Sequence, residues 1–158
     1  KVALLNIGAE ETKGRELELE AYKLLEQSGL NFGGNIEARD IPNGQYQVIV
    51  TDGFTGNIVL KLYEGMGSFF ARKLRWIFSG AGKLGAVFSL GKIRAFKKQM
   101  DYKEVGGSAL LGVRKPVIKA HGSSDGTAFF NAVRQAKKCA EVNVAGVIEE
   151  YAAATHKE

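Results

Sequence analysis

The amino-acid sequence predicts an α/β fold built on a parallel, doubly wound sheet. Two segments have the apolar character of buried strands, residues 1–7 (KVALLNI) and 48–50 (VIV), and a helical pattern lies between them. A further strand-like segment at 31–36 and a further helical pattern from Asn57 continue the alternation. This alternation is typical of parallel sheets, in which ligands bind outside the carboxyl ends of the strands.

The first helix is predicted over residues 17–28, after a polar loop at 8–14. Its apolar face should hold the residues that recur with a period of about 3.6. These residues are Leu17, Ala21, Leu24, Leu25 and Ser28. Gly29 is the expected C-cap. Residues 38–44 are predicted as loop and turn, because Pro, Asn and Gly cluster there.

The turn after the strand at 48–50 is the place where we expect a binding site. Asp52 and Gly53 end the strand, Gly56 extends the turn, and a helix is predicted to begin at Asn57. A helix N-terminus after such a turn presents backbone N–H groups and the positive end of the helix dipole, which suit phosphate or another oxyanion. The spacing is neither GxGxxG nor that of a P-loop, so an ordinary α/β turn is the alternative.

Residues 66–100 are predicted to form a helical hairpin that projects from the sheet. The segment holds eight of the 22 basic residues and no Asp or Glu. The rest of the chain has 14 basic and all 17 acidic residues, so it is mildly acidic. This asymmetry favours a local anionic partner and argues against general nucleic-acid binding. Large apolar residues alternate with the cations, as at Leu84, Val87, Phe88 and Lys92. We expect a second subunit or a membrane surface to cover them, and burial in the chain's own core is the alternative.

Two more strands are predicted at 108–113 and 116–120, joined by a tight turn at Arg114 and Lys115. His121, Gly122 and Ser123 then form a second strand-to-helix turn, in which Ser124 or Asp125 is the expected N-cap. A last helix is expected at 143–154. The helix before it is expected to bury Phe129, Ala132, Val133, Ala136 and Ala140.

A chain of 158 residues is long enough for one α/β domain, and we expect residues 1–158 to form a single unit. Its abrupt start on a core strand suggests that more chain precedes it. No apolar run approaches the length of a membrane span. The single cysteine, Cys139, excludes an internal disulfide, fits a reducing cytoplasm and has no histidine near it in sequence.

Four side chains in these loops could carry chemistry, and each has a plainer alternative. Lys13 could neutralise a phosphate or be solvated, and Asn57 could donate to an oxyanion or cap the helix. Asp52 could orient a partner or cap the turn. His121 could act as a general base or phosphate ligand, or be a satisfied histidine at a strand end. Because neither metal-ligand spacing nor a GxSxG elbow is present, we predict no metal and phosphate itself as the attacking group.

Five blocks of this sequence resemble, in order and spacing, the phosphate acyltransferases of bacterial phospholipid synthesis, the PlsX family. The blocks are LLNIGAEETKG (4–14), GGNIEARDI (33–41), DGFTGNIVLK (52–61), GGSALLGV (106–113) and PVIKAHGSSD (116–125). The resemblance implies a three-layer α/β/α fold like that of isocitrate and isopropylmalate dehydrogenases. Since it covers only the C-terminal half of the family pattern, we expect the chain to be the C-terminal part of a larger enzyme.

The same resemblance implies a reaction and its partners. Acyl carrier protein thioester and inorganic phosphate would give acyl phosphate and free carrier protein without a cofactor, in a cytoplasmic homodimer loosely associated with the membrane. It implies Lys13 and Asn57 as catalytic residues. Phosphate is expected at Asp52, Gly53 and Gly56, and near His121, Gly122 and Ser123. One alternative is a non-catalytic membrane- or partner-docking module that uses residues 66–100. The other, a metal-dependent dehydrogenase of the same fold, is disfavoured by the missing carboxylates.

Overall fold

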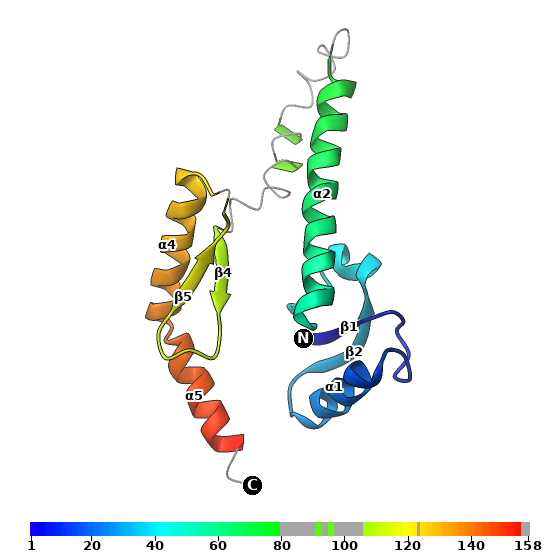
Figure 1. Cartoon of the computed structure of the whole chain (residues 1–158), viewed down its shortest axis with the longest axis vertical. Helices are drawn as coiled ribbons and strands as arrows, with labels where there is room; N and C mark the ends of the chain where they lie inside the picture. The colour runs from blue at the N-terminus through cyan, green and yellow to red at the C-terminus, as the bar shows by residue number, and fades with distance from the viewer. Residues whose placement is uncertain (80–90, 93–94, 97–105, 123, 156–158) are drawn as a thin grey trace. The chain divides into compact units, whose positions relative to one another are not determined.

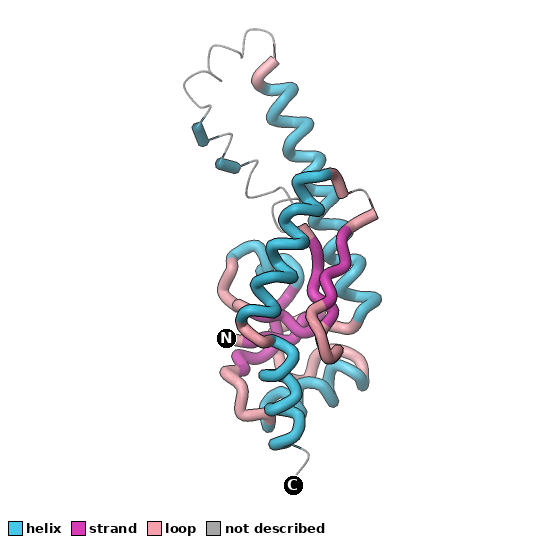
Figure 2. Tube along the Cα trace, turned by 90° about the vertical axis from the view of Figure 1, so that its left-hand side faces the viewer, coloured by secondary structure: helices cyan, strands magenta, loops and turns pink. Residues whose placement is uncertain are grey.

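The computed structural model describes residues 1–79, 91–92, 95–96, 106–122 and 124–155 (Figure 1). Two compact units divide the chain, Lys1–Gly65 and Met66–Glu158, and the division falls within one long helix. Each unit has a small sheet of its own. Helices make up more of the described chain than strands do (Figure 2). An α/β fold is therefore confirmed, while the single unit over 1–158 stays a prediction.

The first unit is built on a three-stranded parallel sheet in the order β2–β1–β3. Its strands are β1 (Val2–Asn6), β2 (Phe32–Glu37) and β3 (Val48–Val50). The central strand, β1, pairs with both neighbours, so that Leu4 is aligned with Asn35 on one side and with Val50 on the other. Ala3, Leu4 and Leu5 are at most 5% exposed. The predicted strands and their parallel arrangement are confirmed.

Helix α1 (Glu16–Gln27) packs on this sheet with a face that agrees with the predicted one at Ala21 and Leu25 and differs from it elsewhere. Leu17 and Leu24, which we predicted to be buried, are 56% and 62% exposed. Tyr22 accounts for the difference, because its ring meets the ring of Phe32 on β2 edge-on, with centroids 5.1 Å apart. The residues of α1 that are half-buried are Glu18, Leu19, Ala21, Tyr22 and Leu25.

Helix α2 (Gly53–Ile77) begins at Gly53 and not at Asn57 as predicted. Asp52 causes the earlier start, because one of its carboxylate oxygens accepts hydrogen bonds from the backbone N–H groups of Phe54 (2.9 Å) and Thr55 (2.8 Å). A Cβ at Gly56 would lie 2.7 Å from Cγ2 of Thr51, so glycine lets the first turn approach the end of β3. Before this helix, residues 38–43, predicted as loop, form the short 3-10 helix η1 (Ala38–Asn43).

The first arm of the predicted hairpin is not a separate helix but the C-terminal part of α2, which continues to Ile77. Glycines within the segment lower helix stability by only about 1 kcal/mol each and do not interrupt it. Of the second arm, Gly91, Lys92, Ala95 and Phe96 are described and are helical. Leu84, Val87 and Phe88 lie outside the described residues. Among the described residues, no helix combines the length and the apolar character that crossing a bilayer requires.

The second unit contains an antiparallel hairpin of β4 (Gly107–Leu110) and β5 (Val117–Ala120). Residues 111–116 join the strands, so the tight turn predicted at Arg114 and Lys115 is wrong. Helix α4 (Gly126–Glu141) packs on this hairpin, and α5 (Val144–Thr155) follows it (Figure 1). Asp125 caps α4, because its Oδ1 accepts a hydrogen bond from the N–H of Ala128 at 3.0 Å.

The buried face of α4 consists of Ala128, Asn131 and Ala132. Phe129 and Val133, predicted to be buried, are 61% and 55% exposed, while Ala128 and Ala132 are at most 5% exposed. The backbone at Gly106 lies very close to α4, since a Cβ on Gly106 would be 2.4 Å from the backbone nitrogen of Ala132. This short distance explains why alanines are buried there. Large side chains do not fit at such a short separation, so the helix turns its alanines toward the hairpin.

We expect Gly106→Ala to destabilise the protein more than Gly112→Ala does. Both glycines have positive φ, 86° and 78°, so each substitution carries a backbone cost of about 1–2 kcal/mol. Only at Gly106 would the new methyl group meet backbone atoms of α4, which adds roughly 1–3 kcal/mol. Urea unfolding followed by circular dichroism measures both losses, and equal losses would contradict the close approach.

Candidate functional site

An open pocket of about 530 Å³ lies in the first unit, at the carboxyl ends of β1 and β2. Its walls come from the end of β1, the beginning of α1, the end of β2 with the beginning of η1, and the first two turns of α2. The lining residues are Leu5, Asn6, Ile7, Gly14, Arg15, Glu18, Glu37, Ala38, Arg39, Thr55 and Val59. A pocket of this size at this edge of a parallel sheet is the usual place for a ligand.

Arg15 joins the first turns of the two helices that flank this pocket. Its guanidinium donates hydrogen bonds to the carboxylate of Glu18, one turn along α1, and to Oδ2 of Asp52 at 3.1 Å. The backbone N–H of Arg15 also donates to Glu18, at 2.7 Å. These hydrogen bonds raise the pKa of Arg15 and lower the pKa of Glu18. Both groups are therefore charged at neutral pH, and Arg15 is a fixed link between the loop after β1 and the loop after β3.

Asp52 is the centre of this link. Besides the two backbone N–H groups that it caps, it accepts a hydrogen bond from Oγ1 of Thr55 at 2.6 Å. Hydrogen bonding by Thr55, first from its hydroxyl and then from its N–H, lowers the pKa of Asp52 to about 2. The capping role raised for Asp52 is confirmed, and its carboxylate also accepts a hydrogen bond from Arg15, whereas a role in orienting a reaction partner stays a prediction. The N–H groups of Phe54 and Thr55 already have an acceptor from the chain itself.

The charged residues of the pocket form ion pairs. Arg39 donates to Glu37 at 2.9 Å, as Arg15 does to Glu18, so the lining carries equal numbers of guanidinium and carboxylate groups. Its apolar part includes Leu5, Val59 and Ile7, whose side chain is 81% exposed. Such a lining can hold a ligand that has both an apolar portion and groups that form hydrogen bonds.

The two residues predicted to be catalytic lie beside this pocket but do not line it. Lys13 has an exposed side chain and precedes Gly14, and its carbonyl accepts a hydrogen bond from Nδ2 of Asn6 at 2.9 Å. Asn57, also exposed, lies in α2 between Thr55 and Val59. Because Asn57 is inside the helix, it does not cap it, and that alternative is wrong.

The other residues predicted to bind phosphate belong to two places. Gly53 and Gly56 lie in the first turn of α2, next to Asp52. His121 and Gly122 follow β5 in the second unit and are exposed, and the carbonyl of His121 accepts a hydrogen bond from the N–H of Ser124 at 3.0 Å. Ser123 lies outside the described residues. Asp125, not Ser124, is the cap of the following helix.

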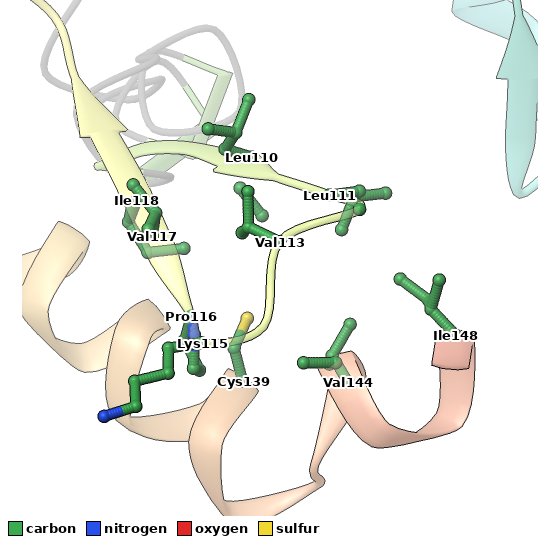
Figure 3. Close-up of a pocket in the computed structure, with 13 residues that line it drawn as sticks. Leu110, Leu111, Val113, Lys115, Pro116, Val117, Ile118, Cys139, Val144 and Ile148 are labelled. Atoms are coloured by element: carbon green, nitrogen blue, oxygen red, sulfur yellow. The ribbon is translucent and has the colours of Figure 1, made fainter. Parts of the chain in front are cut away.

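Cys139 belongs to a small apolar cluster in the second unit (Figure 3). The cluster encloses about 20 Å³ between the β4–β5 hairpin, α4 and α5, which is room for about one water molecule. Cys139 points from α4 toward the loop that carries Val113 and Pro116, whereas the Lys115 side chain extends away from the cluster (Figure 3). Cys139 therefore acts as a small apolar side chain in packing.

The part of α2 in the second unit presents aromatic and basic side chains together. The ammonium group of Lys73 lies 5.7 Å from the ring centroids of both Phe69 and Trp76. Together with Arg72, these side chains surround an open surface hollow of about 350 Å³. Of the four hairpin residues named as membrane or partner contacts (Leu84, Val87, Phe88 and Lys92), Lys92 alone is among the described residues, and its side chain is exposed. Within the ranges that the structure describes, no group of three His, Cys, Asp or Glu side chains is placed to hold a metal ion.

The sequence interpretation missed the polar residues that line the pocket, which are Asn6, Arg15, Glu18, Glu37, Arg39 and Thr55. The spacing of Arg15 and Glu18 is that of an i,i+3 ion pair at a helix start, and this signal was available. The contact of Arg15 with Asp52, 37 residues away, had no local signal.

A parallel sheet with a pocket that combines polar and apolar groups between two helix N-termini places the chain among α/β proteins with a candidate ligand site. The comparison with known proteins gives the family. The family model described as "Fatty acid synthesis protein" matches residues 1–147, and the chain belongs to that family.

Three relatives carry the name phosphate acyltransferase. The chain is 48% identical to the one from Thermoanaerobacter pseudethanolicus over 155 residues, 95% of this chain and 46% of the relative. It is 47% identical to the one from Bacillus licheniformis (95% of this chain, 46% of the relative) and 51% identical to one from Clostridium botulinum (94% and 45%). The chain thus spans slightly less than half the length of these relatives and matches their C-terminal part.

We expect Asp52→Asn to flatten the loss of stability at acid pH. The pKa of Asp52 is about 2 in the folded protein, below its usual value of 3.8. The folded state therefore binds fewer protons between these values, and the stabilisation is complete above about pH 4 and is lost as the pH falls toward 2. Melting temperatures measured from pH 2 to 7 should show a lower plateau and a shallower acid slope for this variant. Asp40→Asn on η1 is the control, and an unchanged slope in Asp52→Asn would refute the assignment.

Proposed function

We propose that the protein containing this chain transfers a fatty acyl group from acyl carrier protein to inorganic phosphate, and so forms acyl phosphate for phospholipid synthesis. The observation that carries the proposal is the identity of 47–51% over about 95% of the chain with relatives named phosphate acyltransferase. In the same proposal the complete enzyme is a cytoplasmic homodimer with the three-layer α/β/α fold of the isocitrate and isopropylmalate dehydrogenases.

The proposed reaction needs no nucleophile from the protein. A phosphate oxygen attacks the carbonyl carbon of the thioester, the carbonyl oxygen becomes an oxyanion, and the C–S bond then breaks to release the carrier thiolate. The protein has to hold phosphate close to the thioester and to stabilise the oxyanion. No covalent acyl-enzyme forms on this route.

Lys13 and Asn57 have these two roles in the proposal. Lys13 neutralises phosphate, and the amide of Asn57 donates a hydrogen bond to the oxyanion. Gly53 and Gly56 are proposed to contact phosphate from the first turn of α2, where a Cβ on Gly53 would meet no atom within 4 Å. Asp52 holds this turn and Arg15 in place, which follows from its contacts and revises the expectation that it binds phosphate itself. His121, Gly122 and Ser123 are proposed to complete the phosphate site in the intact enzyme.

The balance of charge in the pocket supports the role of Lys13. Arg15 and Arg39 are paired with Glu18 and Glu37, so the lining contributes little net positive charge. Lys13 adds a cation in the loop immediately beside Gly14, which does line the pocket. Since the paired charges of the lining largely cancel, the net attraction of an anionic substrate to this pocket would come chiefly from Lys13.

We expect Lys13→Ala and Asn57→Ala each to lower acyl phosphate formation by about 10²-fold or more, as the loss of one preorganised contact does. The assay follows acyl phosphate from acyl carrier protein thioester and phosphate, with the intact enzyme. Cys139→Ser is the control and should retain full activity, because direct attack by phosphate needs no thiol. Normal turnover in both alanine variants, or an acyl group trapped on Cys139, would contradict the mechanism.

We further propose that residues 66–100 contact an anionic surface, at the membrane or on the acidic carrier protein. In the described part of this segment, Arg72 and Lys73 lie beside Trp76, which is 72% exposed. Each cation near an anionic bilayer contributes about 1 kcal/mol of binding free energy, and exposed aromatic rings add burial.

We expect Lys73→Glu with Trp76→Glu to reduce binding to vesicles that contain anionic lipid, with little change in turnover on soluble carrier thioester. Leu84→Glu with Val87→Glu is the equivalent change at the predicted hairpin tip. Vesicle cosedimentation measures binding, and Lys115→Glu in the β4–β5 loop controls for the change in charge. Undiminished binding of both double variants would exclude this segment as the membrane contact. A parallel loss of turnover would assign it to the catalytic site or to carrier binding.

A further inference from the structure

Two buried asparagines on neighbouring strands donate hydrogen bonds to the loop that carries Lys13. Asn6 at the end of β1 is 8% exposed, and Asn35 on β2 is 7% exposed. Asn6 donates from Nδ2 to the carbonyl of Lys13 at 2.9 Å, and Asn35 donates from Nδ2 to the carbonyl of Glu10 at 2.8 Å. The N–H of Lys13 in turn donates to the carbonyl of Glu10 at 3.1 Å.

Two glycines make this arrangement possible. Gly14 has a φ of 103°, and a Cβ on it would lie 2.8 Å from Oδ1 of Asn6. A Cβ on Gly8 would lie 2.9 Å from Cγ of Lys13, so the Lys13 stem runs close over the backbone of Gly8. The loop is therefore fixed on both sides of Lys13 and along the first part of its side chain.

Stability alone does not account for Asn35. Its Oδ1 is buried and has no hydrogen-bond partner among the described residues, and an unpaired buried amide oxygen lowers stability. The carbonyl that its Nδ2 contacts already accepts the N–H of Lys13. An apolar residue of similar volume would still leave the Glu10 carbonyl with the hydrogen bond from Lys13, so what the asparagine adds is a second hold on the position of the loop.

We infer that Asn6 and Asn35 are positioning residues that hold the backbone of Lys13 beside the pocket. This inference rests on the proposed function of Lys13 as the cation that neutralises phosphate. With both asparagines in place the backbone of Lys13 is ordered before substrate binds, and only its exposed side chain has to adjust. Misplacement by about 1 Å at such a group can cost up to 10²-fold in rate.

The test compares Asn35→Leu and Asn6→Asp with Asn43→Leu in the intact enzyme. Asn6→Asp keeps the acceptor for the N–H of Ile7, which Oδ1 of Asn6 binds at 2.8 Å, but removes the donor to Lys13. Asn43 is exposed on η1 and serves as the matched control. We expect Asn35→Leu to leave the melting temperature unchanged or higher and to lower kcat about 10-fold to 10²-fold. KM for the carrier thioester should stay within about twofold, since neither asparagine is proposed to bind the carrier.

A second readout does not depend on activity. Hydrogen exchange of the Lys13 amide in the free enzyme should accelerate about 10-fold or more in Asn35→Leu and Asn6→Asp, and not in Asn43→Leu. Unchanged exchange, or a fall in kcat that only parallels a fall in melting temperature, overturns the inference. Normal kcat in both variants, in an enzyme that Lys13→Ala inactivates, also overturns it. If the wild type forms no acyl phosphate, the proposed function fails, and exchange alone still decides whether the asparagines hold the loop.

Discussion

The arrangement of the first unit depends on the carboxylate of Asp52. It caps α2 through the N–H groups of Phe54 and Thr55, and it binds the guanidinium of Arg15 at the start of α1. Since α1 follows β1 and α2 follows β3, one side chain joins the loops after two adjacent strands of the sheet. The pocket lies at this junction, and its shape depends on both loops keeping their places.

The same carboxylate determines how an anion can bind here. A helix N-terminus attracts phosphate through free N–H groups, but two of those in α2 are occupied by Asp52. The nearby guanidinium groups are paired with Glu18 and Glu37. In the proposed mechanism Lys13 supplies the charge that favours an anion, and the buried asparagines hydrogen-bond to the backbone of the loop that carries it.

In each unit a glycine lets the backbone of one segment lie close to a neighbouring segment. Gly14 lies against Asn6, and Gly106 lies against the backbone at Ala132. Each contact leaves no room for a Cβ, and each fixes a segment without burying a large side chain. The buried apolar residues in the described parts of the chain are accordingly few: Ala3, Leu4, Leu5, Ile36, Ala128 and Ala132.

The sequence by itself determined the elements that depend on local pattern. The apolar runs predicted β1 and β3, the alternation predicted a parallel sheet, and the five sequence blocks predicted the family. The tertiary structure decided which face of a helix is buried, because Tyr22 and Gly106 select neighbours that are distant in sequence. It also decided the start of α2 and the contact between Arg15 and Asp52, since a carboxylate can bind several donors and only the fold determines which ones come within reach.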